Sequence, residues 1–132
     1  MNYGMQVETY MLKGCCCAEA IVRGALMLMG EESEALCAAA AGLCGGIRTG
    51  HDCGALSGGA MMLSLFDRGT AAQVMIPELV EWFDDRFGME YGSVSCEDIA
   101  GEGLRYKAER CKPMTIAVYE KCVELLRDNG FL

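Results

Sequence analysis

Apolar residues recur along most of the chain at intervals of three and four positions, which is the spacing of an amphipathic helix. Runs of β-branched residues, which favour strands, are rare. The pattern predicts helices over Asn2–Lys13, Cys16–Met29, Glu34–Leu43, Gly54–Phe66, Ala71–Phe87 and Cys96–Ala100, and a final helix from Pro113 that stops at Asn129 and Gly130. We therefore expect an all-α fold, a compact bundle of about five to seven helices, as a single domain over residues 1–132.

Local signals predict where several of these helices begin and end. Ser33 and Ser95 are favourable N-caps, Thr70 is expected to cap the helix after it, and Gly88 is expected to end that helix. Pro77 lies within the same helix, so a kink or a restart is expected there.

Two further segments carry weaker signals. The polar stretch from Gly101 to Lys112 predicts a loop with a helical piece around Leu104–Arg110. In the first helix, the expected buried positions are Met5, Tyr10 and Met11.

The most unusual stretch runs from Cys44 to Phe66, where a glycine-rich loop ending at Cys53 leads directly into an apolar helix. This helix contains Gly54, Gly58 and Gly59, and each glycine in a helix costs about 1 kcal/mol relative to alanine. That cost is offset only where backbone must lie tightly against another helix or a bound group. We therefore predict a close approach here, with Gly54 and Gly58 as cofactor-binding positions.

Composition narrows the classes of function. The net charge is −8, and the Lys and Arg residues are scattered, which argues against a nucleic-acid partner. No apolar run reaches the roughly 18 residues that a membrane span needs, so no membrane insertion is expected. The start of the chain shows no export signal, which favours a cytoplasmic protein. In that setting nine cysteines indicate metal ligation or thiol redox chemistry rather than a disulfide framework.

Four cysteines share one local setting. Cys17, Cys53, Cys96 and Cys111 each lie at or just before the start of a predicted helix. A helix start presents unpaired N–H groups and a partial positive charge, which favour the thiolate and lower the pKa of a cysteine. Thiolates bind iron or zinc, or attack disulfides. We predict that these four sulfurs meet at one site, with Cys53 as the first candidate for a catalytic atom.

The other cysteines occupy less distinctive positions. Cys37 and Cys122 lie in the middle of predicted helices, which is typical of small buried hydrophobic residues. Cys15 and Cys16 are expected to be incidental or auxiliary. Cys44 could fold back across the glycine loop and become a fifth member of the site.

Polar residues near Cys53 are candidate helpers of its chemistry. His51 is a candidate proton donor or outer partner of the thiolate, and Asp52 is expected to cap the following helix. The loop Gly45–Gly50, with Arg48, could cradle an anion, but it lacks the Gly-Lys-Ser/Thr ending of a nucleotide P-loop.

Nearly the whole chain resembles the C_GCAxxG_C_C family of small redox-active proteins, which is named for its cysteine pattern. The motifs that carry this resemblance are Cys17-Ala-Glu-Ala-Ile, Gly45-Gly-Ile-Arg-Thr-Gly, Cys53-Gly-Ala-Leu-Ser-Gly-Gly, Phe83-Asp-Asp-Arg-Phe-Gly, and the single cysteines Cys96 and Cys111. The resemblance implies a helical protein with a redox role. It also implies a cluster, because a related domain occurs in split-Soret type cytochromes, for which an iron–sulfur centre is proposed.

The favoured function is electron transfer through an iron–sulfur cluster held by Cys17, Cys53, Cys96 and Cys111. A second hypothesis is a dithiol–disulfide protein without a metal, in which Cys53 attacks and Cys17 or Cys44 resolves. A third is a zinc-stabilised interaction module. The expected partner is a redox protein, and the packed residues Trp82 and Phe83 could equally serve a homodimer surface.

Overall fold

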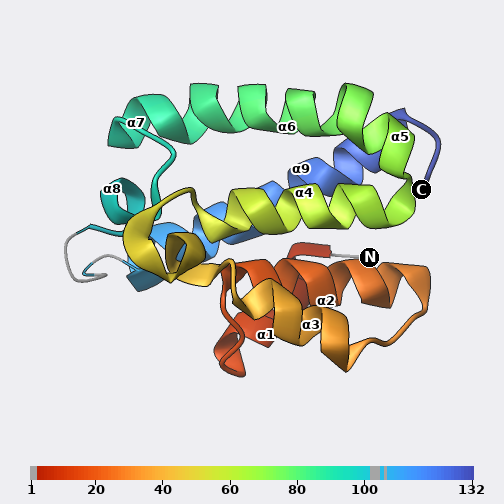
Figure 1. Ribbon diagram of the computed structural model, residues 1–132, viewed down its shortest axis with the longest axis horizontal. Coiled ribbons are helices and arrows are strands. Elements are labelled where there is room, and N and C mark those ends of the chain that lie inside the picture. Colours follow the sequence, from red (N-terminus) through yellow and green to blue (C-terminus); the bar gives the residue numbers. More distant parts are fainter. Residues whose placement is uncertain (1–2, 102–104, 106) are drawn as a thin grey trace.

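The computed structural model describes residues 3–101, 105 and 107–132. Within these ranges the regular structure is helical and contains no strand, so the all-α expectation is confirmed. The α-helices are α1 (Tyr3–Leu12), α2 (Cys17–Met29), α3 (Glu34–Ala41), α4 (Gly54–Phe66), α5 (Arg68–Thr70), α6 (Ile76–Phe83), α7 (Met89–Tyr91), α8 (Cys96–Ala100) and α9 (Lys112–Asp128). They pack into one compact body, with α4 and α9 between the run α5–α7 on one side and α1–α3 on the other (Figure 1).

The segments from α5 to α7 form one continuous helical run (Figure 1), in which five-residue π-helical turns separate the α-helical pieces. Proline offers no N–H to the helix, and the first of these turns lies just before Pro77. The run starts earlier than predicted, because the Asp67 carboxylate accepts the Thr70 N–H at 2.9 Å. It also passes Gly88 and ends at Gly92, whose φ of 87° is left-handed. The predicted cap at Thr70 and stop at Gly88 are therefore wrong.

Other helix ends agree with the sequence. α4 has the predicted bounds, and Ser33 and Ser95 cap α3 and α8 by accepting the N–H groups of Leu36 and Asp98 at 3.2 and 3.1 Å. In α1, however, Met5 is 59% exposed, so its predicted burial is wrong.

The last helix begins earlier than its proline suggests. A π-helical turn over 107–111 runs directly into α9, so Cys111 lies within a helical run rather than ahead of one. The predicted helical piece over 104–110 is thus confirmed from residue 107, while 104 and 106 lie outside the described residues.

Close helix packing depends on small residues. A Cβ atom on Gly58 would lie 2.8 Å from the Cα atom of Ala18, so α4 and α2 touch almost backbone to backbone. The buried Tyr119 of α9 crosses to α2, where its hydroxyl donates to the Gly24 carbonyl at 3.0 Å. Phe83 is fully buried in the same core, which contradicts a role on a dimer surface.

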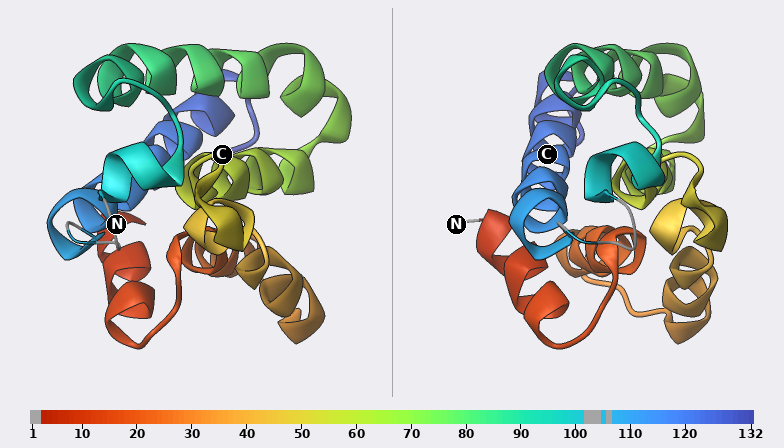
Figure 2. Two further views of the ribbon diagram at one scale, coloured as in Figure 1. Left: turned by 60° about the vertical axis from the view of Figure 1, so that its left-hand side comes forward. Right: turned by 90° about the vertical axis from the view of Figure 1, so that its left-hand side faces the viewer.

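This packing gathers several helix ends at one end of the molecule. The N-terminal ends of α2, α4 and α9 lie together there, beside α8 and the loop that follows α3 (Figures 1 and 2). In the part of the chain that the structure describes, no helix combines the length and apolar character needed to cross a membrane.

Candidate functional site

A partly enclosed cavity of about 90 Å³ lies where these helix ends meet. The residues around it are Met11, Cys16, Cys17, Cys44, Gly45, Arg48, Cys53, Gly54, Cys96, Ile99, Ala100, Cys111 and Met114. The structure thus brings together all four cysteines that the sequence analysis selected, although they are far apart along the chain. Their role as ligands stays a prediction.

Cys17 and Cys53 are brought together by the close contact of α2 with the start of α4. Cys17 is the first residue of α2, and Cys53 directly precedes α4. A Cβ atom on Gly54 would lie 2.7 Å from the Cys17 sulfur and 2.9 Å from the Leu43 carbonyl oxygen. The predicted close approach at Gly54 is therefore present, and the approaching atom is a cysteine sulfur.

Cys96 is brought to the cavity by a short backbone pairing. The Cys53 N–H donates to the Val94 carbonyl at 2.9 Å, and the Cys96 N–H donates to the His51 carbonyl at 2.5 Å. These bonds hold residues 51–53 antiparallel to residues 94–96, with a bridge between Asp52 and Ser95. The pairing fixes Cys96 beside Cys53.

Cys111 enters from the helical run that leads into α9. The preceding Arg110 donates from Nη1 to the Ile99 carbonyl of α8 at 3.3 Å, which ties this run to α8. Within the run, the buried hydroxyl of Thr115 donates to the Cys111 carbonyl at 2.6 Å. The position of Cys111 is therefore fixed by a hydrogen bond of the residue before it and by one to its own carbonyl.

Burial decides the protonation of Cys53. It raises the pKa of the Cys53 thiol to about 12, and the neighbouring Cys17 and Cys111 add to this increase. The N–H groups of Ala55 and Leu56, in the first turn of α4, act in the opposite direction and lower the pKa. The helix-start effect is thus present but outweighed by burial, so the predicted lowering of the Cys53 pKa is wrong.

The donor set around the cavity is made of sulfur. Apart from Arg48, the described residues that line it carry no charged side chain, and their polar side chains are those of cysteines. Within the described ranges, no three His, Cys, Asp or Glu side chains are already positioned as a metal-binding group. The arrangement is that of a thiol-lined cavity rather than of a formed metal centre.

A disulfide joins Cys16 to Cys44 in the wall of the same cavity. From the sequence Cys16 was expected to be incidental or auxiliary, and here it is a bonded partner. Cys44 does reach the site, as considered from the sequence, but its sulfur is bonded to Cys16. It therefore cannot resolve a disulfide at Cys53 while this bond persists.

The loop after Cys44 winds in the left-handed sense. Gly45, Gly46, Ile47 and Arg48 have φ values of 65°, 62°, 56° and 60°. For residues with a side chain this conformation costs about 1–2 kcal/mol each. The turn carries Arg48 to the cavity, where its Nη2 donates to the Ala41 carbonyl at 2.7 Å. No anion site is needed to explain this arginine.

Three residues proposed from the sequence lie away from the cavity lining. Gly58 packs against the α2 backbone instead of facing a bound group. His51 is exposed and contributes backbone bonds to Gly46 and Cys96. The first turn of α4 has no side-chain cap, so the predicted cap at Asp52 is wrong.

The remaining cysteines stand outside the cavity. Cys15 is half-buried and its thiol donates to the Glu19 carboxylate at 3.4 Å. Cys122 is fully buried and its thiol donates to the Gly59 carbonyl at 3.7 Å, while Cys37 is buried among apolar residues of α2 and α3. The packing role predicted for Cys37 and Cys122 is confirmed.

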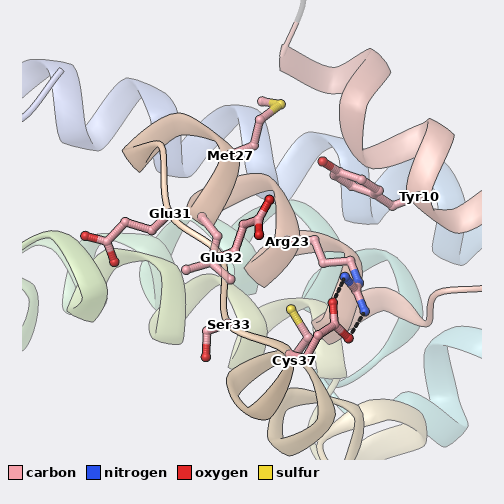
Figure 3. A pocket seen from close by; sticks show the side chains of 9 residues that line it. Tyr10, Arg23, Met27, Glu31, Glu32, Ser33 and Cys37 are labelled. Carbon is pink, nitrogen blue, oxygen red and sulfur yellow. Dashed lines mark hydrogen bonds and ion pairs between the residues drawn. The ribbon is translucent and has the colours of Figure 1, made fainter.

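A second, more open groove of about 410 Å³ lies beside α2 and α3 (Figure 3). Its arginine, Arg23, is held by the carboxylates of Glu34 at 3.0 Å and Glu19 at 2.9 Å. Glu31 and Glu32 also border the groove, and Cys37 lines it from α3. The positive charge of Arg23 is thus already paired with carboxylates of the protein itself.

Comparison with known proteins adds one finding. The model of the family C_GCAxxG_C_C, described as "Putative redox-active protein (C_GCAxxG_C_C)", matches residues 15–125, which include all nine cysteines and every α-helix except α1 and the last three residues of α9. Neither a curated protein nor a solved structure shows a significant match.

Proposed function

This chain belongs to the C_GCAxxG_C_C family of putative redox-active proteins, and we propose that it transfers electrons through an iron–sulfur cluster bound in the cysteine cavity. The observation that carries the proposal is the meeting of Cys17, Cys53, Cys96 and Cys111 around one cavity. Cysteine thiolates are the usual ligands of such clusters.

The surroundings of the four thiols fit this group. The site offers sulfur donors, and the apolar side chains of Met11, Ile99, Ala100 and Met114 make up part of its lining. Such a low-dielectric site disfavours free thiolates, which explains the raised pKa of Cys53. Cationic iron would offset this penalty, so we expect binding to release protons.

A bound cluster would supply a one-electron couple. The protein's own contribution is to hold the sulfurs and to tune that couple. The N–H groups of Ala55 and Leu56 favour negative charge on the Cys53 sulfur, and hydrogen bonds to sulfur raise the potential of a cluster. Gly54 leaves the Cys17 sulfur the space that a side chain would fill. A redox protein remains the proposed partner.

The test is purification without oxygen, followed by iron and sulfide analysis and visible spectroscopy. We expect a coloured protein with iron and sulfide in similar amounts. Zinc without colour would instead favour the structural zinc module, and protein that binds neither metal after reconstitution would reject any metal centre.

A matched pair of variants assigns the ligand. Cys17→Ser should lose the cluster, whereas Cys15→Ser, two positions away and outside the cavity lining, should keep it. Equal cluster content in the two variants would contradict the proposed ligand set.

A further inference from the structure

The disulfide in the cavity wall is a redox group that the proposed electron transfer does not use. It links Cys16, just ahead of α2, to Cys44, in the segment after α3, across 28 residues. Both residues line the cavity that also holds the four thiols. Among its described lining residues, the cavity therefore contains both oxidised and reduced cysteine.

Packing already holds the two sides of this disulfide in place. Two residues beyond Cys16, Ala18 of α2 lies against Gly58 of α4. On the other side, the Cα atom of Cys44 would lie 3.2 Å from a Cβ atom on Gly54. The segment that follows Cys16 and the backbone of Cys44 thus both pack on α4, so this packing holds the two cysteines near each other without help from the covalent bond.

The two cysteines of the disulfide differ in how much of each residue is exposed to solvent. Cys16 is half-buried, whereas Cys44 is only 2% exposed. A thiolate from solution can therefore reach the sulfur of Cys16 more easily than that of Cys44, and exchange rates depend on which sulfur is accessible. The asymmetry assigns Cys16 as the attacked atom and Cys44 as the leaving group.

We propose that Cys16–Cys44 is a redox-active disulfide that accepts two electrons from a dithiol, independently of any metal in the cavity. The first thiolate of the dithiol bonds to the Cys16 sulfur, and the Cys16–Cys44 bond breaks. Cys44 leaves with the electron pair and takes up a proton. The second thiol of the dithiol loses its proton and attacks the mixed disulfide, which releases Cys16. The dithiol ends as a disulfide, and the protein gains two electrons and two protons.

The position of Arg48 is consistent with Cys44 as the leaving group. It lies four residues beyond Cys44 and is the one charged side chain among the described residues that line the cavity. A positive charge at the same cavity stabilises a departing thiolate. Reduction also adds Cys44 to the thiols that face the cavity.

The first experiment measures reduction of the folded protein by dithiothreitol. Samples are quenched with acid at intervals, alkylated, and analysed by mass spectrometry for each cysteine. We expect Cys16 and Cys44 to become alkylated together, at a rate proportional to dithiothreitol and unchanged by urea below the unfolding transition. A purely structural disulfide would be reduced only through unfolding, so a rate that rises with urea in step with the unfolded fraction would overturn the proposal.

The second experiment identifies the attacked sulfur. In Cys44→Ser, the remaining Cys16 thiol should form a mixed disulfide with glutathione disulfide about ten times faster than Cys44 does in Cys16→Ser. Cys15→Ser is the matched control and should retain the disulfide and its reduction rate. Equal trapping rates in the two single variants would overturn the assignment of Cys16.

Both experiments are run on metal-free protein and on protein reconstituted with iron and sulfide. Reduction of the disulfide in protein that takes up no iron would support this inference while rejecting the proposed cluster. Should either serine variant fail to fold, as judged by circular dichroism, the measurement on the unaltered chain still decides whether the disulfide is redox-active.

Discussion

Cys53 and Cys122 are both buried cysteines with a pKa raised by burial, yet their surroundings differ. Cys53 borders a cavity together with Cys17, Cys96 and Cys111. Cys122 is packed against α4, where its thiol donates to a backbone carbonyl. Burial and pKa therefore do not separate a functional thiol from a packing thiol. What distinguishes Cys53 from Cys122 is that Cys53 lines a cavity together with other cysteines.

The strongest test of this comparison is to remove each sulfur in turn. Cys53→Ser should lower the iron bound per folded molecule by about tenfold or more, because a ligand is lost. Cys122→Ala should leave that ratio unchanged and instead lower the free energy of unfolding by about 1–2 kcal/mol. Iron analysis and urea denaturation measure the two effects. If Cys122→Ala lost iron as Cys53→Ser does, the distinction between the two thiols would fail.

The glycine that follows Cys53 extends the comparison to the backbone of the cavity. In Gly54→Ala the new methyl group would meet the Cys17 sulfur and the Leu43 carbonyl, and the carbonyl cannot move without the chain. We expect a loss of about 1–3 kcal/mol in the free energy of unfolding, together with weaker binding of iron.

Gly69→Ala is the matched control for this substitution. Gly69 is exposed in α5, and the atom nearest to the position of the new methyl group is 3.8 Å away. Alanine should stabilise the protein by up to about 1 kcal/mol through helix propensity. Thermal unfolding compares the two variants, and equal effects would show that the crowding around Gly54 is unimportant.

The protonation of Cys122 gives a smaller, pH-dependent effect. Burial raises the pKa of the Cys122 thiol, so the folded protein keeps it protonated. In the unfolded chain a cysteine ionises above pH of about 8.5, which stabilises the unfolded state. The contribution of Cys122 to stability is therefore full below that pH and falls as pH rises, by about 1.4 kcal/mol per unit.

The measurement compares the unaltered chain with Cys122→Ala in urea under reducing conditions at pH 8 and pH 10. The stability advantage of the unaltered chain should shrink at the higher pH. A constant difference would mean that Cys122 ionises equally well in both states.

Much of this site could be predicted from sequence because its signals are local. Cys17 and Cys96 begin helices, Cys53 directly precedes one, and Ser95 caps α8 through its own side chain. Because cysteines recur at several predicted helix starts, the sequence indicated a common site, and in the structure these cysteines line one cavity.

The predictions that failed concern contacts between distant parts of the chain and the burial of individual side chains. Cys16 and Cys44 are 28 residues apart, and only the packing of α2 and Leu43–Cys44 against α4 brings them into bonding range. The pKa of Cys53 was misjudged because a sequence shows the helix start but not the burial that outweighs it. Asp67 replaced Thr70 as a cap because several residues in that turn can accept the same N–H groups.

The groove beside α2 and α3 has no cluster of thiols among the described residues that line it, so it extends the comparison to a third region. A substitution there should have the smallest effect on iron content and on stability. Arg23 is held there by two carboxylates, from Glu19 and Glu34, and the Glu34 side chain is 85% exposed. In Glu34→Gln the ion pair with Glu19 remains, and exposed ion pairs contribute little because water and salt screen them. We expect no measurable change in iron content and almost none in thermal unfolding. A marked loss of either would show that the groove, rather than the cavity alone, supports the function of the protein.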